Sequence, residues 1–600
     1  MSSTGSGNQT SGGRRPAKAP AAPNTQGAAK ATTTSNAQGT RRQLPARATS
    51  TPANASTAPR VRNGPAAEGG AESTSGPSIP FKESDVAHKE HHQTYRKLVN
   101  LVKNRKAEDK PRIFVFTDIE QDYDDLLAII FLAEMHRMGA IELVGFVANH
   151  EPAYQRARFL RTILRLVGLE HLPVGVGSVG TDNLSQHSGV FFYSLKNITF
   201  DRAPWNPPNL ELPDAKTVIT NVLRSKSNVT ALMISSLQDI GEFFDRKDKT
   251  ADFMKYNFTK FISQGGYEVE ATEQAAQSGK SSKPKVKVTL KPVKDMANNK
   301  FNLKQAANYT NHLAAHKLTS DTWSREAAKA ARLPGTFMKE MFQYGPIGAH
   351  LEWLWMRQEF KFYWDPFNWP FMDFLNVDWY LNTRLGLDKT SADFNELRKT
   401  EMPFSDAAPR IKVIAYDGCA AVGAVGDDFM RAMGVLDPES KLPAYNRPDV
   451  AGHPHRVFGK KADDLGGINA RRLAQVMKTF LLGGMIATAG RAESLIPRAS
   501  IKHDHEESGI NLDGFRARIT LRNLRIKLDE DIKRAEEAKA AGKDKEYRRD
   551  LGTIDKRRST IAVYEERIKR EERVTRISEP VRASIPYEQL YQQAMGQTRK

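Results

Sequence analysis

The chain has 600 residues but only one cysteine, Cys419, so it can form neither an internal disulfide nor a cysteine-rich zinc site. It also lacks the roughly 20 consecutive apolar residues of a membrane span; the apolar run LLAIIFLA, which begins at Leu126, is far shorter. Nor does the N-terminus show the apolar core of a secretory signal. These absences favour an intracellular protein, cytoplasmic or nuclear, without membrane contact. The Arg-, Ser- and Ala-rich N-terminus also allows a mitochondrial transit peptide, although it has no amphipathic periodicity.

Acidic residues are absent from the first 67 positions, which hold nine Lys and Arg residues. Residues Arg516–Arg576 contain 20 basic and 13 acidic residues, so the two ends carry +16 of the formal net charge of +19. The body between them is therefore close to neutral. If the chain binds nucleic acid or an acidic partner, we expect the basic ends to make that contact.

Large apolar residues are scarce in residues 1–84, where Ser, Thr, Ala, Gly and Pro dominate. Such a composition buries too little surface to offset chain entropy, so this segment is predicted to be a disordered basic arm. It can serve as a solubilising spacer or as an electrostatic arm for nucleic acid. The length of the chain predicts further regions. We assign residues 85–495 to an α/β domain and residues 496–600 to a charged helical extension.

The C-terminal extension combines many charges with apolar residues at helical spacing. Gly542 and Gly552 are expected to break it into two helices. The pattern is typical of a helical hairpin or a coiled-coil-like appendage used for oligomerisation or partner docking, and we therefore expect a homo-oligomer. A solvated charged helix is the alternative interpretation.

From Pro111 onward, apolar strand patterns alternate with helical patterns. RIFVF, IELVGFVA and LPVGVG read as strands, and DDLLAIIFLAEMHRM and YQRARFLRTILRLVGL between them read as helices. VTALMISSL and FTKFISQGGYE continue the series. This alternation predicts an α/β fold with a mainly parallel central sheet flanked by helices. In such sheets, ligands bind at the carboxyl ends of the strands.

Three segments depart from this alternation. Residues 268–297 are predicted to be an inserted loop, in which KVKVTL could form a small exposed hairpin. Trp353–Tyr380 contains five of the seven tryptophans, which predicts a core or a subunit interface, with a nucleobase-stacking wall as the alternative. GVGSVG, Gly175–Gly180, matches a dinucleotide-binding spacing, but the loop-like TDNLSQHSG follows it, so we do not expect that function here.

The stretch FTDIEQDYDD, Phe116–Asp125, places five acidic side chains directly after an apolar strand. Carboxylates so close together repel one another and are costly to bury without a positive partner. Asp417 follows a second apolar strand, in IKVIAYDGCAAVGAV. Oxygen ligands at strand ends and helix starts suit the hard cations Ca²⁺ and Mg²⁺. The sequence therefore predicts a divalent metal site formed by these two strand ends.

TDIEQDYDDLLAI resembles the signature of the inosine–uridine-preferring nucleoside hydrolase superfamily, in its variant T-D-I-G-G-D-x-D-D. Five further segments resemble family motifs in the same order, within about Pro111–Gly484. ELVGFVANHEPAYQRARFL is similar to the second strand and asparagine-bearing loop, ISSLQDIGEFF to G-P-L-T-N-L, and KFISQGGYE to V-x-M-G-G. NKFNLKQAANY is similar to E-F-N-x-x-x-D-P-E-A-A, and AYDGCAAVGA to H-D-P-x-A-V-A. The resemblance implies a nucleoside hydrolase-like fold for residues 85–495.

The resemblance also implies a function: Ca²⁺-dependent hydrolysis of the N-glycosidic bond of a ribonucleoside, giving ribose and a free base, as in purine or pyrimidine salvage. Ca²⁺ is expected rather than Mg²⁺. By the same resemblance, Asp118 would be the catalytic residue that activates water. The implied metal ligands are Asp118, Asp122, Asp125, Asp417 and the main-chain carbonyl of Gln238. The implied substrate-binding residues are Asp124, Asn149, Asn302 and Tyr416.

Several residues depart from the family pattern. Glu120 and Gln121 stand where the variant motif has two glycines, and Lys300 replaces the glutamate before F-N. Tyr416 replaces the histidine that often precedes the last aspartate, and a tyrosine with a pKa of about 10 is a poorer acid for a leaving base. His150 competes with Asn149 for the asparagine-loop position. The alternative function is therefore a protein of this fold with weak or no turnover, which binds a ligand or supports an assembly, with basic ends that contact nucleic acid or an assembly partner.

Overall fold

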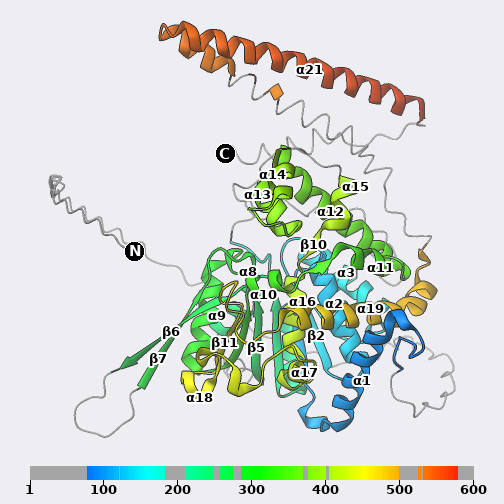
Figure 1. Cartoon of the computed structure of the whole chain (residues 1–600). Helices are drawn as coiled ribbons and strands as arrows, with labels where there is room; N and C mark the ends of the chain where they lie inside the picture. Colours follow the sequence, from blue (N-terminus) through cyan, green and yellow to red (C-terminus); the bar gives the residue numbers. More distant parts are fainter. Residues whose placement is uncertain are drawn as a thin grey trace, which may run out of the picture. The chain divides into compact units, whose positions relative to one another are not determined.

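The computed structural model describes residues 78–578, except for residues 121, 183–209, 247–256, 275–284, 369–375, 400–403, 499–523, 526–527 and 529–530. Its central sheet has seven strands in the order β11-β8-β5-β4-β1-β2-β3 (Figure 1). Every pair of neighbouring strands in this sheet is parallel, as the sequence predicts. The strands are β1 (Arg112–Thr117), β2 (Glu142–Ala148), β3 (Val174–Val176), β4 (Val229–Ile234), β5 (Phe258–Gln264), β8 (Thr319–Trp323) and β11 (His455–Phe458).

Helices cover both faces of the sheet, which explains why its strands read as continuous apolar runs. Side chains of β1 alternate between two apolar cores: Ile113 and Val115 join one, and Phe114 and Phe116 join the other. The first core includes residues of α2 (Asp124–Arg137), α3 (Ala153–Leu166), α16 (Tyr416–Ala424) and α19 (Ala470–Leu495). The second includes residues of α5 (Ala215–Ser225), α6 (Gln238–Asp245) and α9 (Leu303–His316).

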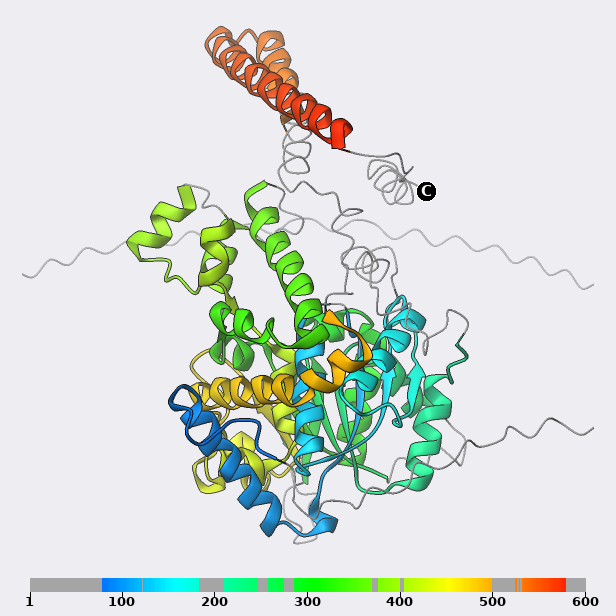
Figure 2. The same cartoon turned by 90° about the vertical axis from the view of Figure 1, so that its right-hand side faces the viewer.

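An N-terminal helix that the sequence patterns did not predict, α1 (Lys89–Asn104), lies beside α19 (Figure 2). The hydroxyl of its Tyr95 donates a hydrogen bond to the buried carboxylate of Glu134 in α2, at 2.5 Å. A Cβ atom on Gly483 of α19 would lie 1.8 Å from this hydroxyl. Glycine at this position therefore lets α1 dock against α19 and reach α2.

Within the described part of the chain, α19 is the one helix that is long and apolar enough to cross a membrane. In the structure, 56% of its apolar window is buried, and the helix packs against α2 and α12 (Gly345–Asn368). A helix inside a protein core passes the same test of length and composition. The finding is therefore weak evidence for a membrane span, and the absence of membrane contact stays a prediction.

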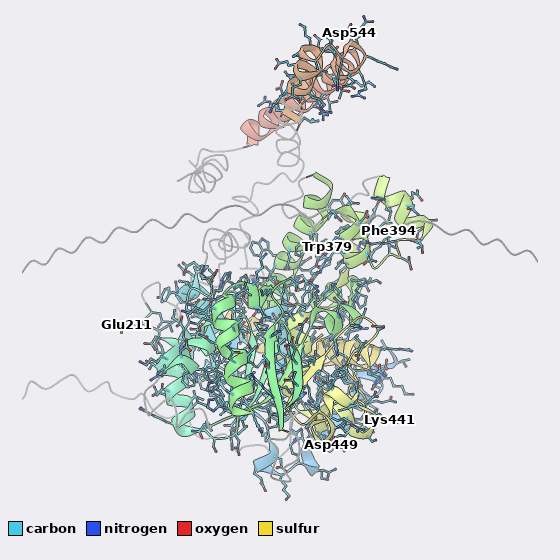
Figure 3. The ribbon with its side chains drawn as sticks, turned by 90° about the vertical axis from the view of Figure 1, so that its left-hand side faces the viewer. Glu211, Trp379, Phe394, Lys441, Asp449 and Asp544 are labelled. Carbon is cyan, nitrogen blue, oxygen red and sulfur yellow. The ribbon has the colours of Figure 1, made fainter. Side chains whose placement is uncertain are left out.

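The tryptophan-rich segment forms helices after β8. α12 is followed by α13 (Val377–Trp379), by a π-helix, η5 (Tyr380–Arg384), and by α14 (Ala392–Lys399). Trp353 and Trp355 of α12 are buried in the first core, as the core interpretation predicts. Trp379 is half-buried and lies in the same helical segment as Phe394 (Figure 3).

The predicted inserted loop contains an antiparallel hairpin, β6 (Tyr267–Gln274) and β7 (Lys285–Pro292). The predicted hairpin is therefore confirmed, while its tip lies outside the described residues. Of the predicted disordered arm, residues 1–77 also lie outside them.

The C-terminal extension forms a helical hairpin in its described part. Helical residues 531–540 turn at Gly542, whose φ is +67°, into α21 (Asp544–Ser578), and Arg557 of α21 donates to Asp531 across the hairpin at 2.7 Å. The predicted break at Gly552 is wrong, because α21 continues through it. One glycine in a helix interior costs only about 1 kcal/mol, which the flanking turns offset.

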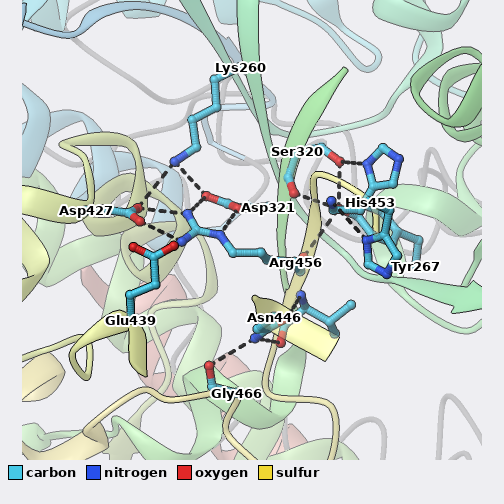
Figure 4. A network of polar contacts seen from close by, with 12 residues as sticks. Lys260, Tyr267, Ser320, Asp321, Asp427, Glu439, Asn446, His453, Arg456 and Gly466 are labelled. Carbon is cyan, nitrogen blue, oxygen red and sulfur yellow. Dashed lines mark hydrogen bonds and ion pairs between the residues drawn. The ribbon is translucent and has the colours of Figure 1, made fainter. Parts of the chain in front are cut away.

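A largely buried ion network joins three strands of the sheet to α17 (Asp427–Ala432) (Figure 4). Arg456 of β11 donates to both oxygens of Asp321 in β8, at 2.7 and 2.8 Å. It also donates to both oxygens of Asp427, at 2.6 and 2.8 Å. Lys260 of β5 lies 2.8 Å from Asp321. The Arg456 and Lys260 cations therefore neutralise the two carboxylates inside the fold.

Candidate metal centre

Four carboxylates meet at the carboxyl end of the sheet. Asp122, Asp124 and Asp125 come from the loop after β1 and the first turn of α2, and Asp417 comes from the first turn of α16. One possible ligand atom from each lies within 4.8 Å of the others. We call these four residues the acid cluster. The structure thus confirms that two segments almost 300 residues apart bring their acids together.

Asp417 reaches the acid cluster by a different route from the one expected. The strand before it, β10 (Lys412–Val413), has two residues and pairs antiparallel with β9 (Leu333–Pro334), outside the central sheet. α16 itself packs against α2 and the strands β4, β5 and β8. This approach requires small residues, because a Cβ on Gly423 would lie 2.5 Å from Nε1 of Trp323. The small residues after Asp417 therefore allow α16 to pack closely, and this packing places the carboxylate of Asp417 at the acid cluster.

The acid cluster is short of positive charge. Burial, reinforced by neighbouring carboxylates, raises the pKa values of Asp124, Asp125 and Asp417 well above their usual range. Asp125 also accepts a short hydrogen bond from Thr117 Oγ1. A bound cation would offset these costs, and four carboxylates are the hard oxygen donors that Ca²⁺ and Mg²⁺ prefer. The donor set therefore fits a divalent cation without identifying which one.

Asp118, the expected catalytic residue, is buried at the end of β1 but is not part of the acid cluster. Burial raises the pKa of its carboxyl to about 7, although the positive charge of Arg156 opposes the shift. The Asp122 carboxylate adds to the increase. Asp118 is thus electrostatically coupled to the acid cluster, while its assignment as a metal ligand stays a prediction.

Arg156 of α3 is a functional candidate that the sequence analysis missed. It is fully buried, and its guanidinium donates to the main-chain carbonyls of Asp118 and Ile119, each at 2.6 Å, and to that of His150 at 3.0 Å. It therefore fixes the loop that begins with Asp118 against the loop after β2. An arginine on the apolar face of an amphipathic helix was the signal that could have identified it.

A second polar group surrounds Asn149 at the end of β2. Asn149 Nδ2 donates to Asp239 Oδ2 of α6 at 2.8 Å, and Asp239 also accepts from the main-chain N–H and the hydroxyl of Ser178, both at 2.8 Å. Asn149 is fully buried, and its Oδ1 accepts no hydrogen bond from the described residues. Asp239 and Ser178 were also missed. Ser178 belongs to GVGSVG, and the two described residues that follow this motif, 181 and 182, are not helical.

The remaining predicted substrate residues lie around α6, α9 and α16. Asn302 caps the N-terminus of α9, where its Oδ1 accepts from the N–H of Gln305 at 3.1 Å, and its Nδ2 lies 3.4 Å from Gln238 Oε1. Gln238 begins α6, and its Nε2 donates to Glu242 at 2.8 Å. Its carbonyl as a metal ligand stays a prediction. Burial raises the pKa of Tyr416 to about 12, and Lys300 is exposed.

Glu120, which the sequence places beside the metal loop, is not a member of the acid cluster. Its φ is +71°, a conformation that favours the glycine of the family motif. Its carboxylate is fully buried and lies 2.8 Å from Nε2 of the equally buried His350 in α12. The carboxylate of Glu120 is therefore hydrogen-bonded to a histidine of another helix.

Solved structures with a similar fold include two effector proteins. The structures titled as the effector protein XOO4466 and as the type III effector protein XopQ complexed with adenosine diphosphate ribose each align with a TM-score of 0.50 and 15% identity. Each alignment covers 66% of this chain and 99% of the effector chain. A plant nucleoside hydrolase, PpNRh1, aligns with a TM-score of 0.35 and 11% identity over 62% of this chain and 98% of its own.

No protein-family model matches the chain, and no curated protein matches it in sequence. At 15% identity, the likeness to the effector structures shows a shared fold and nothing beyond it. The chain is thus an α/β protein with the fold of these effectors and an acid cluster suited to a divalent cation.

Proposed function

We propose that this chain binds a divalent cation, Ca²⁺ rather than Mg²⁺, at the acid cluster and hydrolyses the N-glycosidic bond of a ribonucleoside or related riboside. The observation that carries the proposal is the meeting of Asp122, Asp124, Asp125 and Asp417 at the carboxyl end of a parallel sheet. In α/β sheets, that end is where ligands bind. The raised pKa values of Asp124, Asp125 and Asp417 support a site that is completed by a cation.

When bound, the cation would supply a water of lowered pKa. Asp118 would accept the proton of the attacking water as a general base, since its buried carboxyl is electrostatically coupled to the acid cluster. The water oxygen bonds to the anomeric carbon, the C–N bond breaks, and its electron pair leaves with the base. Asp124 and Asn149 would hold the ribose hydroxyls, and the carboxylates would stabilise positive charge that develops on the sugar.

The departing base needs either a proton or enough stability to leave as an anion. Tyr416, with a pKa of about 12, is a weak proton donor at neutral pH. We therefore expect turnover to be faster with bases that leave readily than with those that require protonation.

The test uses the full chain with inosine, uridine, adenosine and ADP-ribose, in the presence of Ca²⁺ or a chelator, and measures free base chromatographically. We expect base release with Ca²⁺ and none with the chelator. Asp118→Ala should bind Ca²⁺ but release no base. Base release at the wild-type rate by Asp118→Ala would contradict its catalytic role.

The second candidate is a ribosyl-binding protein without turnover. It is favoured by the weak acidity of Tyr416 and by the use of Asn302 as a helix cap. XopQ, which has this fold, was solved with ADP-ribose bound, so ADP-ribose is the first ligand to test. Ca²⁺-dependent binding of ADP-ribose or a nucleoside, with no release of base over a day, would establish this candidate and eliminate the hydrolase.

A further inference from the structure

Helix α12 contacts the loop between β1 and α2 at two separate places. The first is the buried pair of Glu120 and His350, at 2.8 Å. Holding a residue other than glycine at a φ of +71° costs about 1–3 kcal/mol, so the loop keeps this conformation only if surrounding contacts fix it. The Glu120–His350 pair is one such contact, and it links the loop directly to α12.

The second contact is a network around Tyr123, which lies between Asp122 and Asp124 of the acid cluster. Its main-chain N–H donates to Gln358 Oε1 at 3.2 Å, and its hydroxyl donates to Glu359 Oε1 at 2.9 Å. Arg384 Nη2 donates to the same hydroxyl at 2.8 Å. The main-chain N–H and the hydroxyl of Tyr123 are thus held by the segment that runs from α12 to η5.

The network is rigid because its charges neutralise each other away from water. Glu359 is fully buried and Arg384 is 3% exposed. Arg384 Nε donates to Glu359 Oε2 at 3.0 Å, and the guanidinium lies over the ring of Phe362 at 5.1 Å. A buried ion pair with two hydrogen bonds to a tyrosine leaves that tyrosine little freedom. The positions of Asp122 and Asp124 on either side are restricted in turn.

We propose that Tyr123, Glu359, Arg384 and the Glu120–His350 pair are positioning residues, which set the affinity of the acid cluster for its cation without touching it. This inference rests on the metal binding of the proposed function. By thermodynamic linkage, the cation must then stabilise α12 and η5 as much as their contacts favour the cation. Metal occupancy is thereby coupled to the tryptophan-rich segment, far along the sequence from the loop.

The first test is Tyr123→Phe, which keeps the ring and removes only the hydroxyl. We expect the dissociation constant for Ca²⁺, measured by isothermal titration calorimetry, to rise about tenfold, as is typical when a group that orients ligands is lost. The matched control is Tyr309→Phe, a fully buried tyrosine of α9 in the opposite core. Its hydroxyl has no hydrogen-bond partner among the described residues, so this change should leave the dissociation constant as in the wild type.

The second test measures hydrogen exchange in the wild type with and without Ca²⁺, which requires no variant to fold. Ca²⁺ should slow exchange of α12 and η5 amides as well as those of the loop. If Tyr123→Phe binds Ca²⁺ like the wild type, or if α12 exchange is unchanged by Ca²⁺, the positioning role is wrong. If the wild type binds no Ca²⁺ in the calorimeter, the proposed function itself fails, and the two failures are thereby distinguished.

Discussion

The acid cluster and the Asp321–Arg456 network both bury carboxylates, but they obtain positive charge in opposite ways. In the network, Arg456 of β11 and Lys260 of β5 come from the two strands on either side of β8, and both lie against Asp321 and Asp427. Despite burial, these cations hold the pKa values of Asp321 and Asp427 below the usual range. In the acid cluster, burial and mutual repulsion raise the pKa values of Asp124, Asp125 and Asp417.

The difference teaches that buried carboxylates alone do not indicate a metal site; the lack of a neutralising cation from the chain does. The network is complete as folded, since its charges are balanced by the chain. The acid cluster is not: the charge of Arg156 lowers the pKa of Asp125 but does not keep it from rising well above its usual range, and Arg384 is paired with Glu359. A carboxylate removed from each region should therefore have opposite effects on stability.

The largest expected effect is on activity, from Asp417→Asn. Loss of one of four charges and of an anionic ligand should lower turnover by about a thousandfold and abolish measurable Ca²⁺ binding. In the metal-free protein, the same change should raise the melting temperature, because it removes repulsion. Base release, calorimetry and thermal unfolding measure the three effects. Asp449→Asn, at an exposed position, is the control. If Asp417→Asn kept its activity, Asp417 would not belong to the site.

In the ion network, Arg456→Met should destabilise the fold by about 3–5 kcal/mol, because Asp321 then stays buried without its main partner. Denaturant unfolding of the metal-free chain measures this free energy. Arg471→Met, at an exposed position at the start of α19, should change it by less than about 0.5 kcal/mol. Equal effects of the two variants would mean that the network does not support the fold.

The pH dependence of stability should separate the two regions. Folded, metal-free protein retains the Asp118 proton up to about pH 7, whereas the unfolded chain releases it near pH 3.9. The contribution of Asp118 to the free energy of unfolding is therefore fully present below about pH 4 and is lost as the pH rises through about 7. Ca²⁺ binds deprotonated carboxylates and offsets this loss, so it should raise the melting temperature more at pH 8 than at pH 5.

Asp427 should behave in the opposite way, because its folded-state pKa is lowered. Its contribution is present above the unfolded pKa of about 4 and is lost as the pH falls below it. Thermal scans of the metal-free wild type from pH 3 to 8, compared with Asp427→Asn, measure this contribution. If the stability difference between the two proteins did not shrink on acidification, the network assignment would be wrong.

The smallest effect is expected where an ion pair is exposed. Lys291 and Glu270 lie 2.7 Å apart on the β6–β7 hairpin, and about half of each side chain is exposed. Solvent and salt screen such a pair, so Lys291→Ala should cost at most about 0.5 kcal/mol. Denaturant unfolding should show this small loss of stability at low salt and no loss at high salt, whereas the loss caused by Arg456→Met should persist at high salt.

Local patterns predicted the elements that carry the loop of the acid cluster. The apolar run before Asp118 and the acids that open an apolar helix specify β1, the loop and α2 within a few residues. The alternation of strands and helices likewise predicted the parallel sheet. These features depend on side-chain periodicity and short-range geometry, which a sequence displays directly.

Long-range contacts could not be predicted in the same way. The sequence predicts, through its resemblance to a family motif, that Glu120 stands where a glycine is usual, but not that His350, 230 positions later, pairs with its carboxylate. Nor does it show that Tyr123 meets Glu359 and Arg384, or that Arg156 holds the carbonyls of the loop. Each contact depends on how helices pack over the sheet, which no local periodicity encodes.

The sequence by itself determined that several carboxylates would crowd the end of a buried strand and the start of a helix. Only the tertiary structure decided which buried carboxylates receive a cation from the chain. Asp321 and Asp427 meet Arg456 because β11 lies beside β8 and α17 packs near both. Asp122, Asp124, Asp125 and Asp417 meet each other instead, and their repulsion in a site of low dielectric constant makes the acid cluster suited to a divalent cation.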